Sequence, residues 1–172
     1  MFLSVFEMFK VGIGPSSSHT MGPMVAAERF LDHLRQSPFT PHGLRASLHG
    51  SLAFTGVGHA TDRAVILGFD GFTPEHYDKD AADAALMRIQ STKSVSPDGL
   101  GTLRFDPKSD LIFDYENALA GHANGMKLMA TDAQGDVILS EVYYSVGGGF
   151  VMTEAELAGG RNATKGAPVP FP

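Results

Sequence analysis

The sequence predicts an α+β fold in which helices cover one face of a mixed or mainly antiparallel sheet. Apolar residues repeat at helical spacing between Pro23 and Ser37, which is typical of an amphipathic helix. Residues 44–48 alternate apolar and polar side chains, the period of a half-buried strand. Residues 126–131 and 137–144 flank a turn rich in Asp and Gly, the pattern of a β-hairpin. One long helix, one strand and one hairpin therefore define the fold class, and their order in the sheet is left open.

The composition is that of one soluble globular domain. The chain has 172 residues, of which 43% are hydrophobic and 19% are charged. Its formal charge of −6 and its lack of a Lys/Arg cluster argue against nucleic acid as a partner, because phosphate contacts need a basic surface. Glu7 interrupts the apolar N-terminus, and no apolar run approaches the length of a membrane span. We therefore expect a cytoplasmic protein without a membrane anchor.

Two helices are predicted before the first strand. Residues 4–10 begin with Ser4 and carry Glu7 three positions later, the spacing of a capping box, which predicts a short helix. The longer helix begins at Pro23, because proline suits the first turn, and it continues for about four turns. It is expected to end before Ser37, which precedes a second proline.

The middle of the chain continues with a strand and a helix. The alternating residues 44–48 form the strand, and a glycine-rich turn follows them. The apolar run 64–67 predicts the next helix. We place His59 at or just before the start of this helix, with Thr61 and Asp62 in its first turn.

The second half adds one helix and several short strands. Residues 80–90 are rich in alanine and predict a surface helix, and residues 103–105 and 111–113 are strand pieces. Gly147–Gly149 end the hairpin either in a tight bend or in a loop that faces a ligand, and we favour the bend. Residues 159–172 lack apolar periodicity and contain three prolines, so they are predicted to be a linker.

The loop between Gly12 and Pro23 has the residue types of an anion site. Two glycine–proline pairs enclose four hydroxyl side chains and one imidazole, and a predicted helix follows. Backbone N–H groups at such turns and at a helix N-terminus bind carboxylates and phosphates. A serine that only capped the helix would use one hydroxyl and leave the others without a role. The candidate ligand-binding residues are Ser16, Ser17, Ser18, His19 and Thr20.

Two histidine motifs offer proton-transfer groups. His59 and His122 each lie beside glycines that allow a ligand to approach the backbone, and Asn124 follows His122 closely. Imidazole donates or accepts a proton near neutral pH, and an asparagine amide can orient a carboxylate or a neighbouring group. Each motif alone also fits a structural histidine at a turn. The other histidines lack such a context and are expected to be structural: His33, His42, His49 and His76.

Two further interpretations fit the residues less well. His19, His59 and His122 together would suit a catalytic zinc ion, but no short ligand spacing supports this. Ser18 and His19 are adjacent, which rarely aligns a nucleophile with its base, and the chain has no Gly-x-Ser-x-Gly motif. Cysteine is absent, so the chain supplies no disulfide, thiolate nucleophile or cysteine-bound metal.

Five segments in order resemble the β domain of the bacterial iron–sulfur L-serine dehydratases of the single-chain type. The resemblance covers about residues 2–165. One position departs from the pattern: Ala123 stands where a proline is expected, which leaves His122 and Asn124 in place. The segments that carry the resemblance are residues 4–10, 12–20, 58–64, 122–126 and 144–150.

The resemblance implies a carbon–nitrogen lyase that converts L-serine to pyruvate and ammonia with a [4Fe–4S] cluster and without pyridoxal phosphate. The cluster needs cysteine ligands, and this chain has none. The resemblance therefore implies that residues 1–158 form the β domain and that residues 159–172 lead to an α domain that holds the cluster. It also implies a homodimer and a fragment that is inactive by itself.

The same resemblance suggests roles for the candidate residues. The loop 16–20 would hold the substrate carboxylate, His59 and His122 would transfer protons, and Asn124 would orient the substrate or a neighbouring group. We favour His59 as the base, because a helix N-terminus favours the neutral imidazole. A similar domain serves as a regulatory anion-binding module in some phosphoglycerate dehydrogenases, so a binding function without catalysis is the alternative. A purely structural dimerisation domain is a third possibility.

Overall fold

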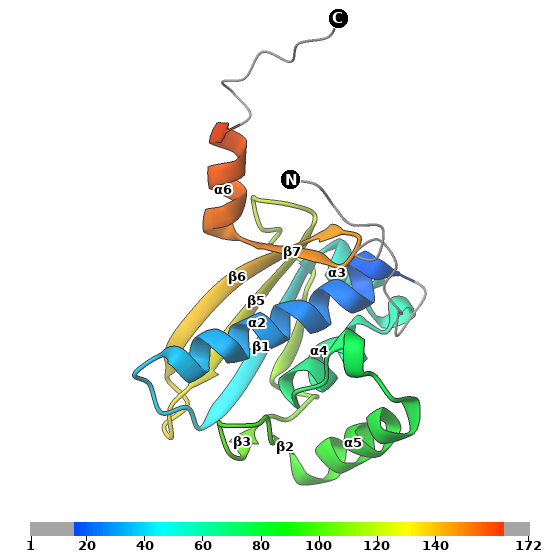
Figure 1. The fold of residues 1–172 in the computed structure, drawn as a ribbon, viewed down its shortest axis with the longest axis vertical. Helices are drawn as coiled ribbons and strands as arrows, with labels where there is room; N and C mark the ends of the chain where they lie inside the picture. The colour runs from blue at the N-terminus through cyan, green and yellow to red at the C-terminus, as the bar shows by residue number, and fades with distance from the viewer. Residues whose placement is uncertain (1–15, 164–172) are drawn as a thin grey trace, which may run out of the picture.

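The computed structural model describes residues 16–163 and confirms the predicted α+β class (Figure 1). The predicted helix at residues 4–10 lies outside the described residues. The strands are β1 (Gly43–Gly50), β2 (Ser94–Val95), β3 (Leu103–Arg104), β4 (Leu111–Asp114), β5 (Asn124–Thr131), β6 (Val137–Gly147) and β7 (Phe150–Thr153). The helices are the π-helix η1 (Ser17–Met21), α2 (Gly22–Gln36), α3 (Ser51–Thr55), the 3₁₀-helix η2 (Val57–His59), α4 (Thr61–Phe69), the 3₁₀-helix η3 (Pro74–His76), α5 (Lys79–Thr92) and α6 (Glu154–Ala163).

The sheet is mixed, and β1 is its centre. Its seven strands follow the order β2-β3-β1-β5-β6-β7, with β4 paired to β1 beside this path. Strand β1 runs antiparallel to β5 from the pair Gly43–Thr131 to the pair Gly50–Asn124, and it runs parallel to β3 and β4. The predicted hairpin is present as β5 and β6. The pairing of β1 with β5 brings the end of β1 beside the start of β5, where the candidate site lies.

The core lies between the sheet and the helices α2, α4 and α5, which cover one face (Figure 1). Leu44, Ala46 and Leu48 of β1 point to this face and have no exposed surface. They belong to the same buried cluster as Phe30 of α2 and Phe69 of α4. Burial of each such side chain contributes roughly 1.5–3 kcal/mol to folding, so this contact fixes α2 and α4 on the sheet.

The start of the first long helix differs from the prediction. We predicted a rigid turn at Gly22-Pro23 and a helix from Pro23, whereas the chain is helical from Ser17, with Gly22 in ordinary right-handed helical geometry. Gly22 is required for packing rather than for a turn. A Cβ at Gly22 would lie 2.0 Å from Oγ of Ser145 on β6. The close approach of helix and strand therefore carries the serine-rich segment directly against the sheet.

Most of the longer elements were predicted and several short ones were not. The helices α2 and α5 and the strands β1, β5 and β6 confirm the predicted segments, and Gly147–Gly149 form the predicted tight bend between β6 and β7. The helix α3 and the strands β2 and β7 were not predicted. Helix α6 extends to Ala163, so the chain is still helical at Gly159, where we predicted that the linker begins. None of the helices within residues 16–163 has the length and apolar character needed to cross a membrane.

Candidate active site

The candidate site lies at one end of the sheet, where the serine-rich segment meets two loops. Figure 1 shows the start of α2 beside α3, which follows β1 directly. The register of β1 with β5 places Gly50 opposite Asn124. The N–H of Ser51 donates to the carbonyl of Ala123 over 2.8 Å, which joins the start of α3 to the loop before β5. Segments far apart in the sequence therefore meet at this corner.

His19 is the centre of a hydroxyl network. Its Nδ1 lies 2.9 Å from Oγ of Ser18, and its Nε2 lies 3.0 Å from Oγ of Ser51. Burial lowers the pKa of His19 below its ordinary value, and the neighbouring His59 lowers it further, while the contact with Ser51 partly opposes this shift. His19 is thus held neutral near pH 7, where it accepts one hydrogen bond and donates another to the serine hydroxyls.

Two buried threonines join the serine-rich segment to the loop of His59. Oγ1 of Thr20 donates to the carbonyl of His59 over 2.9 Å, and Oγ1 of Thr61 donates to the carbonyl of His19 over 2.5 Å. Both threonines are at most 1% exposed. This reciprocal pair of bonds holds the imidazole rings of His19 and His59 with their centroids 5.0 Å apart.

His59 presents one ring nitrogen for chemistry. It is half-buried and ends η2, directly before α4, as the sequence predicted. Its Nδ1 lies 2.9 Å from the carbonyl of Thr55, so Nδ1 must carry a proton and donate it. In the neutral ring the lone pair is therefore on Nε2. Within residues 16–163, Nε2 of His59 has no hydrogen-bond partner.

His122 has the opposite tautomer. Its Nδ1 accepts the N–H of Asn124 over 3.1 Å, so in the neutral ring the proton is on Nε2. The amide of Asn124 in turn donates to the carbonyl of Ser145 over 3.1 Å. His122 is exposed. The two histidines thus differ in what they offer when neutral: His59 offers an acceptor and His122 offers a donor.

The structure brings most of the candidate residues together. One network contains Ser18, His19, Thr20 and His59. Asn124 lies beside this network, because the carbonyl of the preceding residue, Ala123, accepts the N–H of Ser51. His122 is connected to it through Asn124. Ser16 caps η1 by accepting the N–H of His19, and Ser17 is exposed.

Ser51 is a site residue that the sequence analysis missed. The sequence feature that could have indicated Ser51 is its position directly after Gly50, close to the end of the predicted strand. We had assigned the segment that begins there to a turn. The segment forms α3 instead, and the hydroxyl of Ser51 reaches His19 from its first position.

The zinc interpretation finds no support in the structure. Among residues 16–163, no group of three or more His, Cys, Asp or Glu side chains is placed to hold a metal ion. His49 is structural, as predicted, because it is 6% exposed and both ring nitrogens are paired. One contacts Oγ of Ser47 at 2.8 Å and the other the carbonyl of Asn117 at 2.6 Å.

Comparison with known proteins decides the family. The serine dehydratase beta chain family matches residues 4–156, which include every residue of the hydrogen-bond network around His19. The chain belongs to this family. An L-serine dehydratase of Streptomyces coelicolor is 45% identical over 156 residues, which are 90% of this chain and 34% of the relative. An L-serine dehydratase of Haemophilus influenzae is 39% identical over 174 residues, or 99% of this chain and 37% of the relative.

The curated relatives are longer than this chain. A third relative, an L-serine dehydratase of Helicobacter pylori, is 43% identical over 154 residues, which are 90% of this chain and 34% of the relative. The chain spans about a third of the length of the curated relatives that it matches. The five segments that suggested the resemblance all lie within the matched residues 4–156.

The low pKa of His19 predicts how the stability of this beta chain depends on pH. An unfolded histidine has a pKa of about 6.5, so as the pH falls below that value the unfolded chain binds a proton that the folded chain does not. The contribution of His19 to stability should therefore fall from about pH 6.5 down to its folded pKa and change no further below it. In urea unfolding at about pH 7.5 and 5.5, His19→Gln should lose less stability on acidification than the parent chain. Equal losses in both chains would contradict this prediction.

Proposed function

We propose that this chain supplies substrate-binding and acid–base residues to an L-serine dehydratase, which converts L-serine to pyruvate and ammonia. The observation that carries the proposal is the joint network of His19, His59 and the serine hydroxyls, within a chain of the serine dehydratase beta chain family. A network of imidazoles and hydroxyls suits a zwitterionic amino acid, because it offers donors for the carboxylate and an acceptor for a proton.

The serine-rich segment would hold the substrate carboxylate. Ser16, Ser17 and Ser18 lie in the first turn of a helix, where N–H groups and the helix dipole favour an anion. Ser17 is exposed, and Ser18 is oriented by His19. Thr20 is buried and donates to the carbonyl of His59, so in this proposal it positions His59 and does not touch the substrate.

The tautomers support a role for each histidine in the proposed reaction. Nε2 of His59 would accept the α-proton of serine, which leaves the electron pair to form the Cα–Cβ double bond as the Cβ–O bond breaks. The proton on His59 would then pass to the departing hydroxyl, which leaves as water, while Nε2–H of His122 would donate a hydrogen bond to that oxygen. The resulting 2-aminoacrylate gains a proton at Cβ and loses one from nitrogen as it becomes the imine, and water hydrolyses the imine to pyruvate and ammonia. Asn124 would orient His122 through its backbone N–H.

The [4Fe–4S] cluster that the resemblance implies does not fit this chain. The sequence contains no cysteine, and residues 16–163 hold no group of side chains placed for a metal ion. In the proposal the cluster lies in a second part of the enzyme, an α domain that accounts for the remaining length of the relatives. That part would supply a Lewis acid for the substrate oxygens. The proposed partners of this chain are thus L-serine, the α domain and a second protomer in a homodimer.

Pyruvate formation tests the proposal. The complete reading frame with its cysteine-bearing part would be purified without oxygen and assayed with L-serine, beside residues 1–172 alone. Activity in the complete enzyme only is the expected result, because each part holds half of the site. If the complete enzyme formed no pyruvate although its cluster was intact, the proposal that this chain takes part in L-serine dehydration would be contradicted. If the inactive enzyme still bound L-serine in a calorimetric titration, the result would favour the regulatory anion-binding function over the catalytic one.

A further inference from the structure

An exposed aromatic cluster lies directly beside the candidate site. Phe54 on α3 is 68% exposed and Tyr115 after β4 is 54% exposed, and their rings meet edge to face with centroids 5.3 Å apart. Phe113 of β4 stacks on Tyr115 at 6.5 Å, and Val57 of η2 is 67% exposed. A run of exposed aromatic and aliphatic side chains of this kind marks an interaction surface in a soluble protein.

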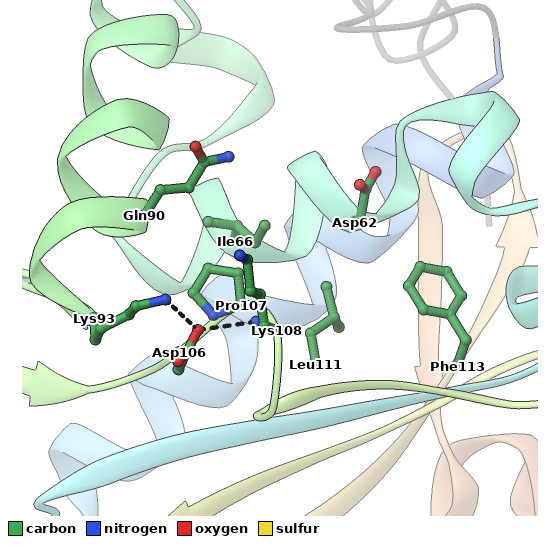
Figure 2. A pocket seen from close by; sticks show the side chains of 9 residues that line it. All are labelled: Asp62, Ile66, Gln90, Lys93, Asp106, Pro107, Lys108, Leu111 and Phe113. Atoms are coloured by element: carbon green, nitrogen blue, oxygen red, sulfur yellow. Dashed lines mark hydrogen bonds and ion pairs between the residues drawn. The ribbon is translucent and has the colours of Figure 1, made fainter.

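The aromatic cluster continues into a groove. Phe113 also lines a pocket of about 420 Å³ whose apolar wall includes Ile66 of α4 and Leu111 of β4. Figure 2 shows Phe113 at one end of this pocket and the ion pair of Lys93 and Asp106 at the other end. The surface therefore has an apolar centre and a charged rim, which is the usual composition of a protein–protein interface.

The same short elements carry this surface and the candidate site. Helix α3 begins with Ser51, which binds His19, and presents Phe54 three residues later. The 3₁₀-helix η2 presents Val57 and ends with His59. A partner that covered Phe54 and Val57 would therefore contact the two short elements that hold Ser51 and His59.

We propose a docking surface for the part of the enzyme that the relatives have beyond this chain. It consists of the aromatic cluster of Phe54, Phe113 and Tyr115, the exposed Val57 and the adjoining groove. This inference rests on the proposed function, because it takes the partner to be the domain that completes the half-site at His59. The length of that part supports it, since the chain spans 34% of the Streptomyces relative. The occupant is thus an apolar face of the cysteine-bearing domain, with polar groups opposite Lys93 and Lys108.

Photo-crosslinking in the complete enzyme tests the docking surface. Phe54 would be replaced by benzoylphenylalanine, and the crosslinked peptides would be identified by mass spectrometry. We expect peptides from the cysteine-bearing part. The matched control is the same replacement at Phe39, which is 44% exposed and precedes β1 at the opposite end of that strand from Gly50, and it should not crosslink to that part. Crosslinks from position 54 to residues 1–15, or to the beta chain of a second protomer, would overturn the inference.

A second measurement separates this inference from the proposed function. Tyr115→Ser should weaken the activity of the complete enzyme by about tenfold or more, the scale of a lost aromatic anchor, while Phe39→Ser should not. Tyr115 is exposed, so neither variant should change the thermal midpoint of residues 1–172. If the parent enzyme makes no pyruvate but position 54 crosslinks to the cysteine-bearing part, the proposed function fails and the docking surface stands. If the parent enzyme is active but Tyr115→Ser is unaffected and the crosslink is missing, the docking surface fails alone.

Discussion

The His59→Asn variant of the complete enzyme is expected to form pyruvate from L-serine about 10²–10⁴ times more slowly than the parent, the usual contribution of a positioned acid or base. Asparagine places its amide nitrogen near the position of Nδ1 and so keeps a donor for the carbonyl of Thr55. It has no group at the position of Nε2, where our proposal places the lone pair that accepts the α-proton. The loss should appear in kcat, because the carboxylate is held by other residues.

The chain contains a matched control for this substitution. His76 also ends a 3₁₀-helix, and its Nδ1 contacts Oγ1 of Thr73 at 3.0 Å, outside the network of His19. His76→Asn should keep turnover within about twofold of the parent, because an exposed surface substitution rarely matters. Near-normal turnover of His59→Asn, with thermal midpoints equal in all three proteins, would remove His59 as the base. The same kinetic test would then be applied to His122.

The predictable parts of the fold are those whose apolar residues repeat over many positions. Helix α2 and strand β1 each place a regular row of side chains in the core, so periodicity alone located them. Strand β2 has two residues and strand β7 has four, which is too short for a recognisable period. Helix α3 could not be predicted for the same reason, because it is a single short turn whose position depends on Gly50 and on the loop before β5.

The chemistry of the candidate site was more predictable than its geometry. Clustered serines around His19 and glycines around His59 indicated ligand binding from residue types alone. Their meeting depends on Thr20 and Thr61, which bridge segments about 40 residues apart. The sequence analysis assigned Thr20 to ligand binding and Thr61 to the first turn of a helix, and neither assignment indicated this bridge. The tautomers of the histidines depend on backbone groups that only the folded chain brings near, such as the carbonyl of Thr55.

The Gly50→Ala variant is expected to lose the largest share of stability among single substitutions near the site. Gly50 has a φ of +56° and a ψ of −129°, a conformation that side chains rarely adopt. A Cβ there would also lie 2.4 Å from the carbonyl oxygen of Ala123. Backbone strain of about 1–3 kcal/mol and overpacking of about 1–3 kcal/mol should act together.

Urea unfolding measures this loss, and Gly159→Ala is its control because no atom lies within 4 Å of a Cβ at that position in α6. The control should keep or slightly raise the free energy of unfolding, since alanine favours a helix by about 1 kcal/mol over glycine. Gly50→Ala should instead lower it by about 2–6 kcal/mol, the sum of strain and overpacking. The carbonyl of Ala123 accepts the N–H of Ser51, so moving it would also displace Ser51 from His19. Unchanged stability would mean that the close contact between β1 and the loop before β5 is not required, and that contact is the one that connects Asn124 to the rest of the site.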